Sequence, residues 1–97
     1  MKHINNTIET VVINNEERQM SIVDLIEITI NNVPQAGLTF KDIQHRLKIK
    51  AAIDKAKEKI NLEDAEFVYL KDAAETVRWA FVHPILIKYQ SIFNGTT

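Results

Sequence analysis

Glycine and proline are unusually scarce in this chain, which has two of each among 97 residues. These residue types build most tight turns, so their scarcity favours a helical fold over a sheet with many short connections. The length is that of one domain. We place this domain at 1–97 and expect flexible termini at 1–6 and 95–97.

Composition excludes several protein classes. Apolar residues make up 45% of the chain, too many for intrinsic disorder, yet no apolar run is long enough to cross a bilayer. Polar residues are scattered through the first 20 positions, where a secretory signal would need an apolar segment. The absence of cysteine excludes disulfides, thiolate metal sites and cysteine nucleophiles. We therefore expect a cytoplasmic protein with no membrane partner.

The N-terminal part has the pattern of a strand. β-branched residues dominate 7–13, and Asn14 and Asn15, which follow, are typical of a turn. This predicts a strand that returns as a hairpin through 18–20. Such a small sheet is marginal unless something packs on it.

Two helix starts follow. Ser21 is followed three positions later by Asp24, the spacing of an N-terminal cap with an acid in the first turn, which predicts a helix over 22–32. Thr39 repeats this arrangement ahead of 40–60, which contains no glycine or proline. The second segment is therefore expected to be helical to about residue 60.

The C-terminal third predicts two further helices. The first, over 63–82, has an apolar stripe at helical spacing. The stripe consists of Phe67, Leu70, Ala74, Val77 and Phe81. Pro84 suits the first position of a last helix that His83 caps. The fold class is therefore mostly α within α+β: a short N-terminal strand or hairpin followed by a compact bundle of about four helices.

Segment 40–60 has apolar residues on two opposite sides when it is placed on a helix. One side holds Phe40, Ile43, Leu47 and Ala51, and the other holds Ile49, Ala52, Ile53, Ala56 and Ile60. Either the helix packs on both sides or it breaks near 48–52. A second apolar surface on so small a protein favours a partner site, and we name Ile49, Ile53 and Ile60 as its candidate residues.

A second candidate surface surrounds Trp79. On a continuous helix this side chain points away from the apolar stripe, and Tyr69 lies partly on the same side. The last helix or the N-terminal sheet could cover this side. Alternatively, Trp79, Tyr69 and Arg78 form an exposed protein-binding patch, because these residue types dominate binding hot spots.

Residues 39–60 also carry seven basic against three acidic side chains. The candidate nucleic-acid-binding residues are Arg46, Lys48, Lys50, Lys55 and Lys57. A basic helix between acidic flanks could contact phosphates. Lysines that border an apolar stripe are also the ordinary pattern of a solvated helix.

No motif points to an enzyme. The histidines His3, His45 and His83 lack metal-ligand spacing, and no glycine-rich phosphate loop is present. Acids near residue 63 suit a helix start, where the helix dipole accounts for them. We therefore predict no catalytic residue, metal, cofactor or small-molecule substrate.

The order of these elements resembles a set of small uncharacterised proteins encoded by tailed bacteriophages and prophages. The resemblance covers roughly 8–94 as a pattern of apolar and charged positions, including the joint Ile60–Glu66 and the last helix Pro84–Phe93. It implies an accessory, assembly, virion or host-inhibiting protein, located in the host cytoplasm or the virion. We thus expect a non-enzymatic module that binds a protein partner or a second copy. The alternative is a small nucleic-acid-binding regulator that uses the basic segment 40–60.

Overall fold

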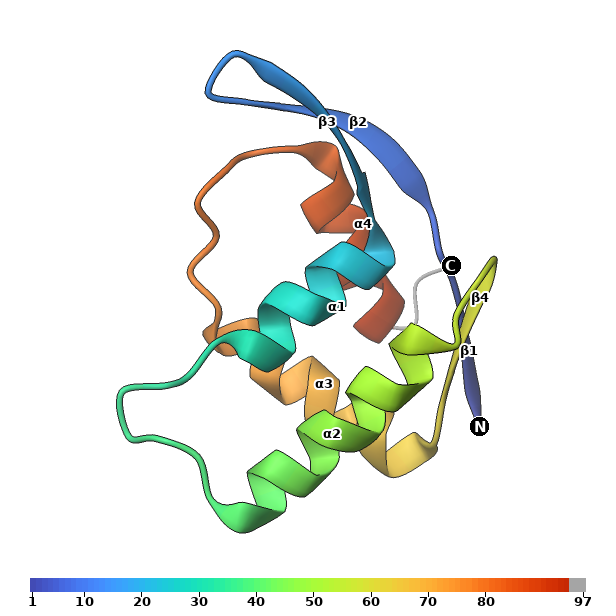
Figure 1. Ribbon diagram of the computed structural model, residues 1–97, viewed down its shortest axis with the longest axis vertical. Helices are drawn as coiled ribbons and strands as arrows, with labels where there is room; N and C mark the ends of the chain where they lie inside the picture. Colours follow the sequence, from blue (N-terminus) through green and yellow to red (C-terminus); the bar gives the residue numbers. More distant parts are fainter. Residues whose placement is uncertain (95–97) are drawn as a thin grey trace.

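The computed structural model describes residues 1–94 of the chain. Its elements are β1 (Lys2–Asn5), β2 (Ile8–Ile13), β3 (Glu16–Ser21), α1 (Ile22–Asn31), α2 (Phe40–Asp54), β4 (Lys59–Leu62), α3 (Asp64–Thr76) and α4 (Pro84–Phe93). The helices form the body of the molecule, and two strand pairs lie at its edge (Figure 1). This mixed α+β fold contains the predicted hairpin and four helices. The flexible terminus expected at 95–97 lies outside the described residues.

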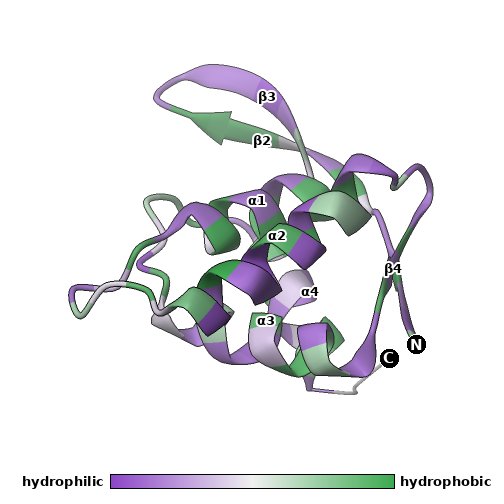
Figure 2. Cartoon of the chain, turned by 60° about the horizontal axis from the view of Figure 1, so that its bottom comes forward, coloured by the Kyte–Doolittle hydropathy of each residue, from purple (hydrophilic) through white to green (hydrophobic). Residues whose placement is uncertain are grey.

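The N-terminal hairpin is confirmed. β2 and β3 are antiparallel, and Ile13 pairs with Glu16 across a two-residue turn. Asn14 and Asn15 in this turn have φ angles of 54° and 65°. Two successive left-handed residues define the turn type whose twist suits a hairpin, and asparagine tolerates that conformation well. The hairpin projects beyond the helices in Figure 1, and Figure 2 shows an apolar β2 beside a hydrophilic β3.

Both predicted helix starts at Ser21 and Thr39 are confirmed as reciprocal caps. The Ser21 hydroxyl accepts from the Asp24 N–H at 3.2 Å, and the Asp24 carboxylate accepts from the Ser21 N–H at 2.8 Å. Thr39 and Asp42 repeat both bonds at 3.1 and 2.8 Å. Each box satisfies backbone donors that the first turn of a helix leaves free. These local bonds determine where α1 and α2 begin.

The expected helix over 40–60 is too long. α2 runs unbroken through 48–52 but ends at Asp54, and β4 follows after a short turn. Ile60 and Leu62 are both buried. Residues two apart share a face in a strand but lie on nearly opposite sides of a helix, so only a strand buries both.

Within the segment 1–6, where we expected a flexible terminus, Lys2–Asn5 forms the strand β1. This strand pairs antiparallel with β4, with Ile4 opposite Ile60. Ile4 is buried in the core. A single apolar residue among polar neighbours carries no periodic signal, so the strand could not be recognised without its distant partner.

The helix expected over 63–82 ends at Thr76, and Val77 has an extended backbone. The following segment contains no helix or strand until α4 begins at Pro84. The early end lets the chain reverse, so that α4 packs on α1. The predicted cap is confirmed, because Nδ1 of His83 accepts from the Ile85 N–H at 3.1 Å.

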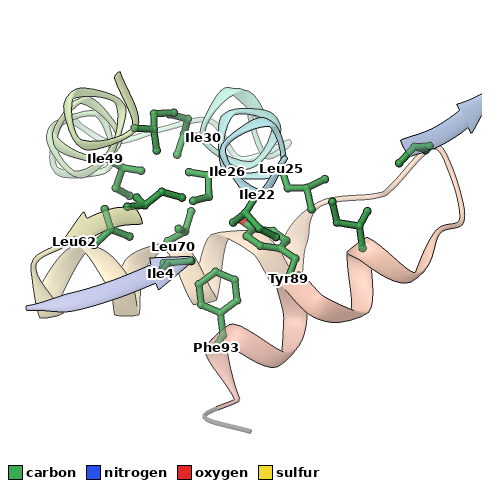
Figure 3. Close-up of a cluster of buried hydrophobic side chains, with 14 residues drawn as sticks. Ile4, Ile22, Leu25, Ile26, Ile30, Ile49, Leu62, Leu70, Tyr89 and Phe93 are labelled. Carbon is green, nitrogen blue, oxygen red and sulfur yellow. The ribbon is translucent and has the colours of Figure 1, made fainter. Parts of the chain in front are cut away.

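The core lies where α1 meets the other helices and the β1–β4 pair (Figure 3). α1 contributes more core residues than any other element, namely Ile22, Leu25, Ile26 and Ile30. Full burial of one such side chain is worth about 1.5–3 kcal/mol, so α1 is the centre of the fold's stability. Within residues 1–94, no helix combines the length and the apolar character needed to cross a membrane.

Candidate functional site

The side of α2 that we first assigned to a partner is buried inside the protein. Ile49 and Ile53 belong to the core, as does Ile60 of β4. Their face of α2 packs toward α1 and α3. The prediction of Ile49, Ile53 and Ile60 as protein-binding residues is therefore wrong, because the fold itself covers them.

The opposite side of α2 is the exposed apolar surface. Phe40 is 87% exposed, Leu47 64% and Ile43 40%. Together with exposed Ala51 they lie along one side of the helix, and we call these four residues the outer face of α2. Figure 2 shows apolar and hydrophilic residues alternating along α2, as expected for a helix with apolar residues on both sides. The helical pattern revealed both sides but could not tell which one the fold covers.

Arg46 holds α2 against the end of α1. Its guanidinium donates to the carbonyls of Thr29, Ile30 and Asn32 at 3.3, 2.8 and 2.6 Å. The last carbonyls of a helix lack partners within it, and α1 has no basic residue in its last turn. Arg46 supplies these donors and is only 7% exposed. It is therefore a structural residue, and its prediction as a nucleic-acid contact is wrong.

Tyr69 connects α3 to the same network. Its hydroxyl accepts from Nε of Arg46 at 2.9 Å and donates to the Asp42 carboxylate at 3.1 Å. Its ring stacks on His45 with centroids 4.7 Å apart. Hydrogen bonds from the Thr39 N–H and hydroxyl lower the pKa of the Asp42 carboxyl. Tyr69 thus links two helices and does not stand in the exposed patch that was the second interpretation of the Trp79 side.

A buried carboxylate lies beside this network and was missed at the sequence level. Glu66 is buried, and one of its oxygens lies 3.1 Å from Nδ1 of His45. Lys48 approaches the same oxygen at 4.0 Å. The other oxygen has no hydrogen-bond partner among the described residues. Glu66 resembled any acid in a first helical turn, so the sequence carried no signal of its burial.

The basic side chains predicted to contact nucleic acid lie in different environments. Lys50 lies 3.0 Å from Glu27 and 3.1 Å from Asp54, and hydrogen bonds to these carboxylates raise its pKa. Lys55 and Lys57 are exposed. With Arg46 buried and Lys50 paired, the predicted nucleic-acid site reduces to three exposed lysines, of which Lys48 and Lys55 line one hollow.

Trp79 lies in the segment between α3 and α4 and is partly buried. Its ring meets Tyr89 of α4 edge to face, with centroids 5.9 Å apart. This agrees with the first of the two interpretations, in which the last helix covers Trp79. Arg78 is exposed, and Tyr69 contacts α2 instead. The structure therefore does not assemble Trp79, Tyr69 and Arg78 into one patch.

The three histidines each have a structural partner. His3 hydrogen-bonds the Asn61 side chain, His45 contacts Glu66 and His83 caps α4. In the part of the chain that the structure describes, no group of three or more His, Cys, Asp or Glu side chains could hold a metal ion.

Comparisons of the chain with protein-family models, curated proteins and solved structures found no match.

Proposed function

We propose that this protein is a non-enzymatic protein-binding module and that the outer face of α2 is its binding surface. The observation that carries the proposal is the exposure of Phe40 and Leu47 on one side of a single helix. Their burial against a partner would contribute about 1.5–3 kcal/mol for each side chain. Exposed apolar residues that line up in this way commonly mark protein-binding sites.

The anchoring of α2 supports the same function. Hydrogen bonds of Arg46 attach α2 to the end of α1 and to Tyr69 of α3. The capping box at Thr39 fixes the first turn of α2, which contains Phe40. A surface held in its binding conformation loses less entropy when a partner docks. The outer face of α2 is therefore suited to a partner that offers its own apolar surface.

The kind of partner follows from the resemblance described above. The order of elements resembles small proteins of tailed phages, which favours an accessory, assembly, virion or host-inhibiting role. A partner in the host cytoplasm, a virion protein or a second copy of this chain would each fit such a role. Sedimentation analysis of the purified protein distinguishes self-association from the other two.

The experiment is affinity capture from bacterial lysate, with and without nuclease, using wild-type protein and two matched variants. Phe40→Asp places a charge on the outer face of α2. Val82→Asp introduces the same charge in place of another exposed apolar residue, between α3 and α4. The proposal predicts a nuclease-resistant partner that Phe40→Asp loses and Val82→Asp retains.

Two outcomes would overturn the proposal. Equal capture by wild type and Phe40→Asp would show that the outer face of α2 takes no part in binding. Partners lost on nuclease treatment would favour the nucleic-acid alternative through Lys48, Lys55 and Lys57. That alternative also predicts binding that weakens steeply with salt.

A further inference from the structure

We propose that the groove between β1 and α4 binds an acidic peptide in extended conformation, by adding it to β1 as a further strand. This groove is a hollow of about 660 Å³. One wall is β1, the other is formed by α4 residues including Ile87, Ser91 and Phe93, and Phe67 of α3 also lines the groove. It shares no residue with the outer face of α2, so the proposal goes beyond the function proposed above.

The free edge of β1 determines the conformation of the ligand. The Asn6 N–H donates to the Glu58 carbonyl at 2.9 Å, which continues the register that pairs Ile4 with Ile60. In an antiparallel pair the intervening residues direct their backbone groups to the other edge, and here these are His3 and Asn5. The Asn5 carbonyl already accepts from the Thr7 N–H at 3.0 Å, so the groups left for a ligand are the N–H and carbonyl of His3 and the N–H of Asn5. Within residues 1–94 no other strand pairs with that edge. An extended peptide is the ligand that satisfies such groups.

The size of the groove limits the segment that it holds. β1 has four residues, so the matching part of a peptide is about four residues, or roughly 13 Å, long. Side chains of an extended peptide alternate between two faces, so every second one points toward the groove. Ile87 is 63% exposed on the α4 wall and would gain burial from an apolar side chain.

The charges of the groove favour an acidic peptide. Its lining includes Lys2 and Lys88 but no aspartate or glutamate. Nζ of Lys2 lies 5.6 Å from the centre of the Phe67 ring, so this ammonium group sits over an apolar part of the lining. Lys88 is already paired with Glu9 at 2.8 Å. A carboxylate on the peptide would therefore meet Lys2 first.

The test is an NMR titration of the full chain with a capped six-residue peptide that alternates valine and glutamate. The proposal predicts shift changes at the amides of His3 and Asn5 and along the α4 wall. A peptide alternating valine and lysine should bind at least tenfold more weakly. A valine–glutamate peptide with N-methylated backbone amides should lose binding, because it cannot pair with β1.

Three variants complete the test. Ile87→Glu should weaken peptide binding at least tenfold, whereas Val82→Glu makes the same change outside the groove and should not. Leu47→Glu should leave peptide binding unchanged even where it abolishes capture through the outer face of α2. Each variant is at an exposed position, and circular dichroism verifies its fold.

Other results would overturn the groove and leave the proposed function intact. These are shift changes confined to residues outside the groove, equal binding of the valine–lysine peptide, or the same affinity for Ile87→Glu and Val82→Glu. An absence of shift changes with the valine–glutamate peptide at millimolar concentration would also overturn it. Loss of partner capture by Phe40→Asp is independent of all four results.

Discussion

The two sides of α2 have similar residues and opposite environments. Ile49 and Ile53 are buried against α1 and α3, whereas Phe40 and Leu47 on the other side remain exposed. Both sides have the spacing of an apolar helix face. The difference therefore comes from the neighbours that the fold provides, and it separates residues that stabilise the protein from residues available to a partner.

The largest expected effect is on the buried side. Ile49→Ala should lower the free energy of unfolding by about 2–5 kcal/mol, since it leaves a cavity in a packed core. Urea denaturation followed by circular dichroism measures this change. A loss below 1 kcal/mol, which is about the effect of a substitution on the surface, would contradict the conclusion that Ile49 lies on the side of α2 that stabilises the protein.

Substitution of Arg46 tests whether its hydrogen bonds stabilise the contact between α2 and α1 in addition to the apolar packing. Arg46→Ala should lower the free energy of unfolding by about 2–3 kcal/mol, because the last carbonyls of α1 lose their donors. Tyr69→Phe removes only hydroxyl bonds and should cost about 1 kcal/mol. Equal losses in the two variants, measured by denaturant titration, would show that the bonds to the α1 carbonyls contribute nothing.

The cap at the start of α2 predicts a pH dependence. The pKa of Asp42 is lowered in the folded protein, so its contribution to stability is complete above the unfolded value of about 3.9 and disappears as the pH falls through the lower folded pKa. Melting temperatures measured between pH 2 and 7 should therefore fall less steeply with acid for Asp42→Asn than for wild type. Parallel curves would contradict this role.

The smallest expected effect on stability is on the outer face of α2. Leu47→Ala should change the free energy of unfolding by no more than about 0.5 kcal/mol, because the side chain is largely in water already. The same variant should weaken capture of a partner. A stability loss as large as that of Ile49→Ala would show that α2 is covered on both sides.

Local sequence determined where α1, α2 and α4 begin. Ser21 with Asp24, Thr39 with Asp42 and His83 before Pro84 each form their cap within a few residues. Asn14 and Asn15 likewise form the turn of the β2–β3 hairpin through their own backbone preferences. These features could be predicted because the interacting groups are close in the chain.

Tertiary structure alone decided the β1–β4 pair, the buried side of α2 and the role of Arg46. β1 and β4 pair although more than half of the chain separates them in the sequence, and Arg46 of α2 donates hydrogen bonds to carbonyls at the end of α1. A helical pattern gives the direction of each side chain but not the neighbour that it meets. Whether an apolar face becomes core or remains a binding surface therefore depends on long-range packing, which local propensity does not encode.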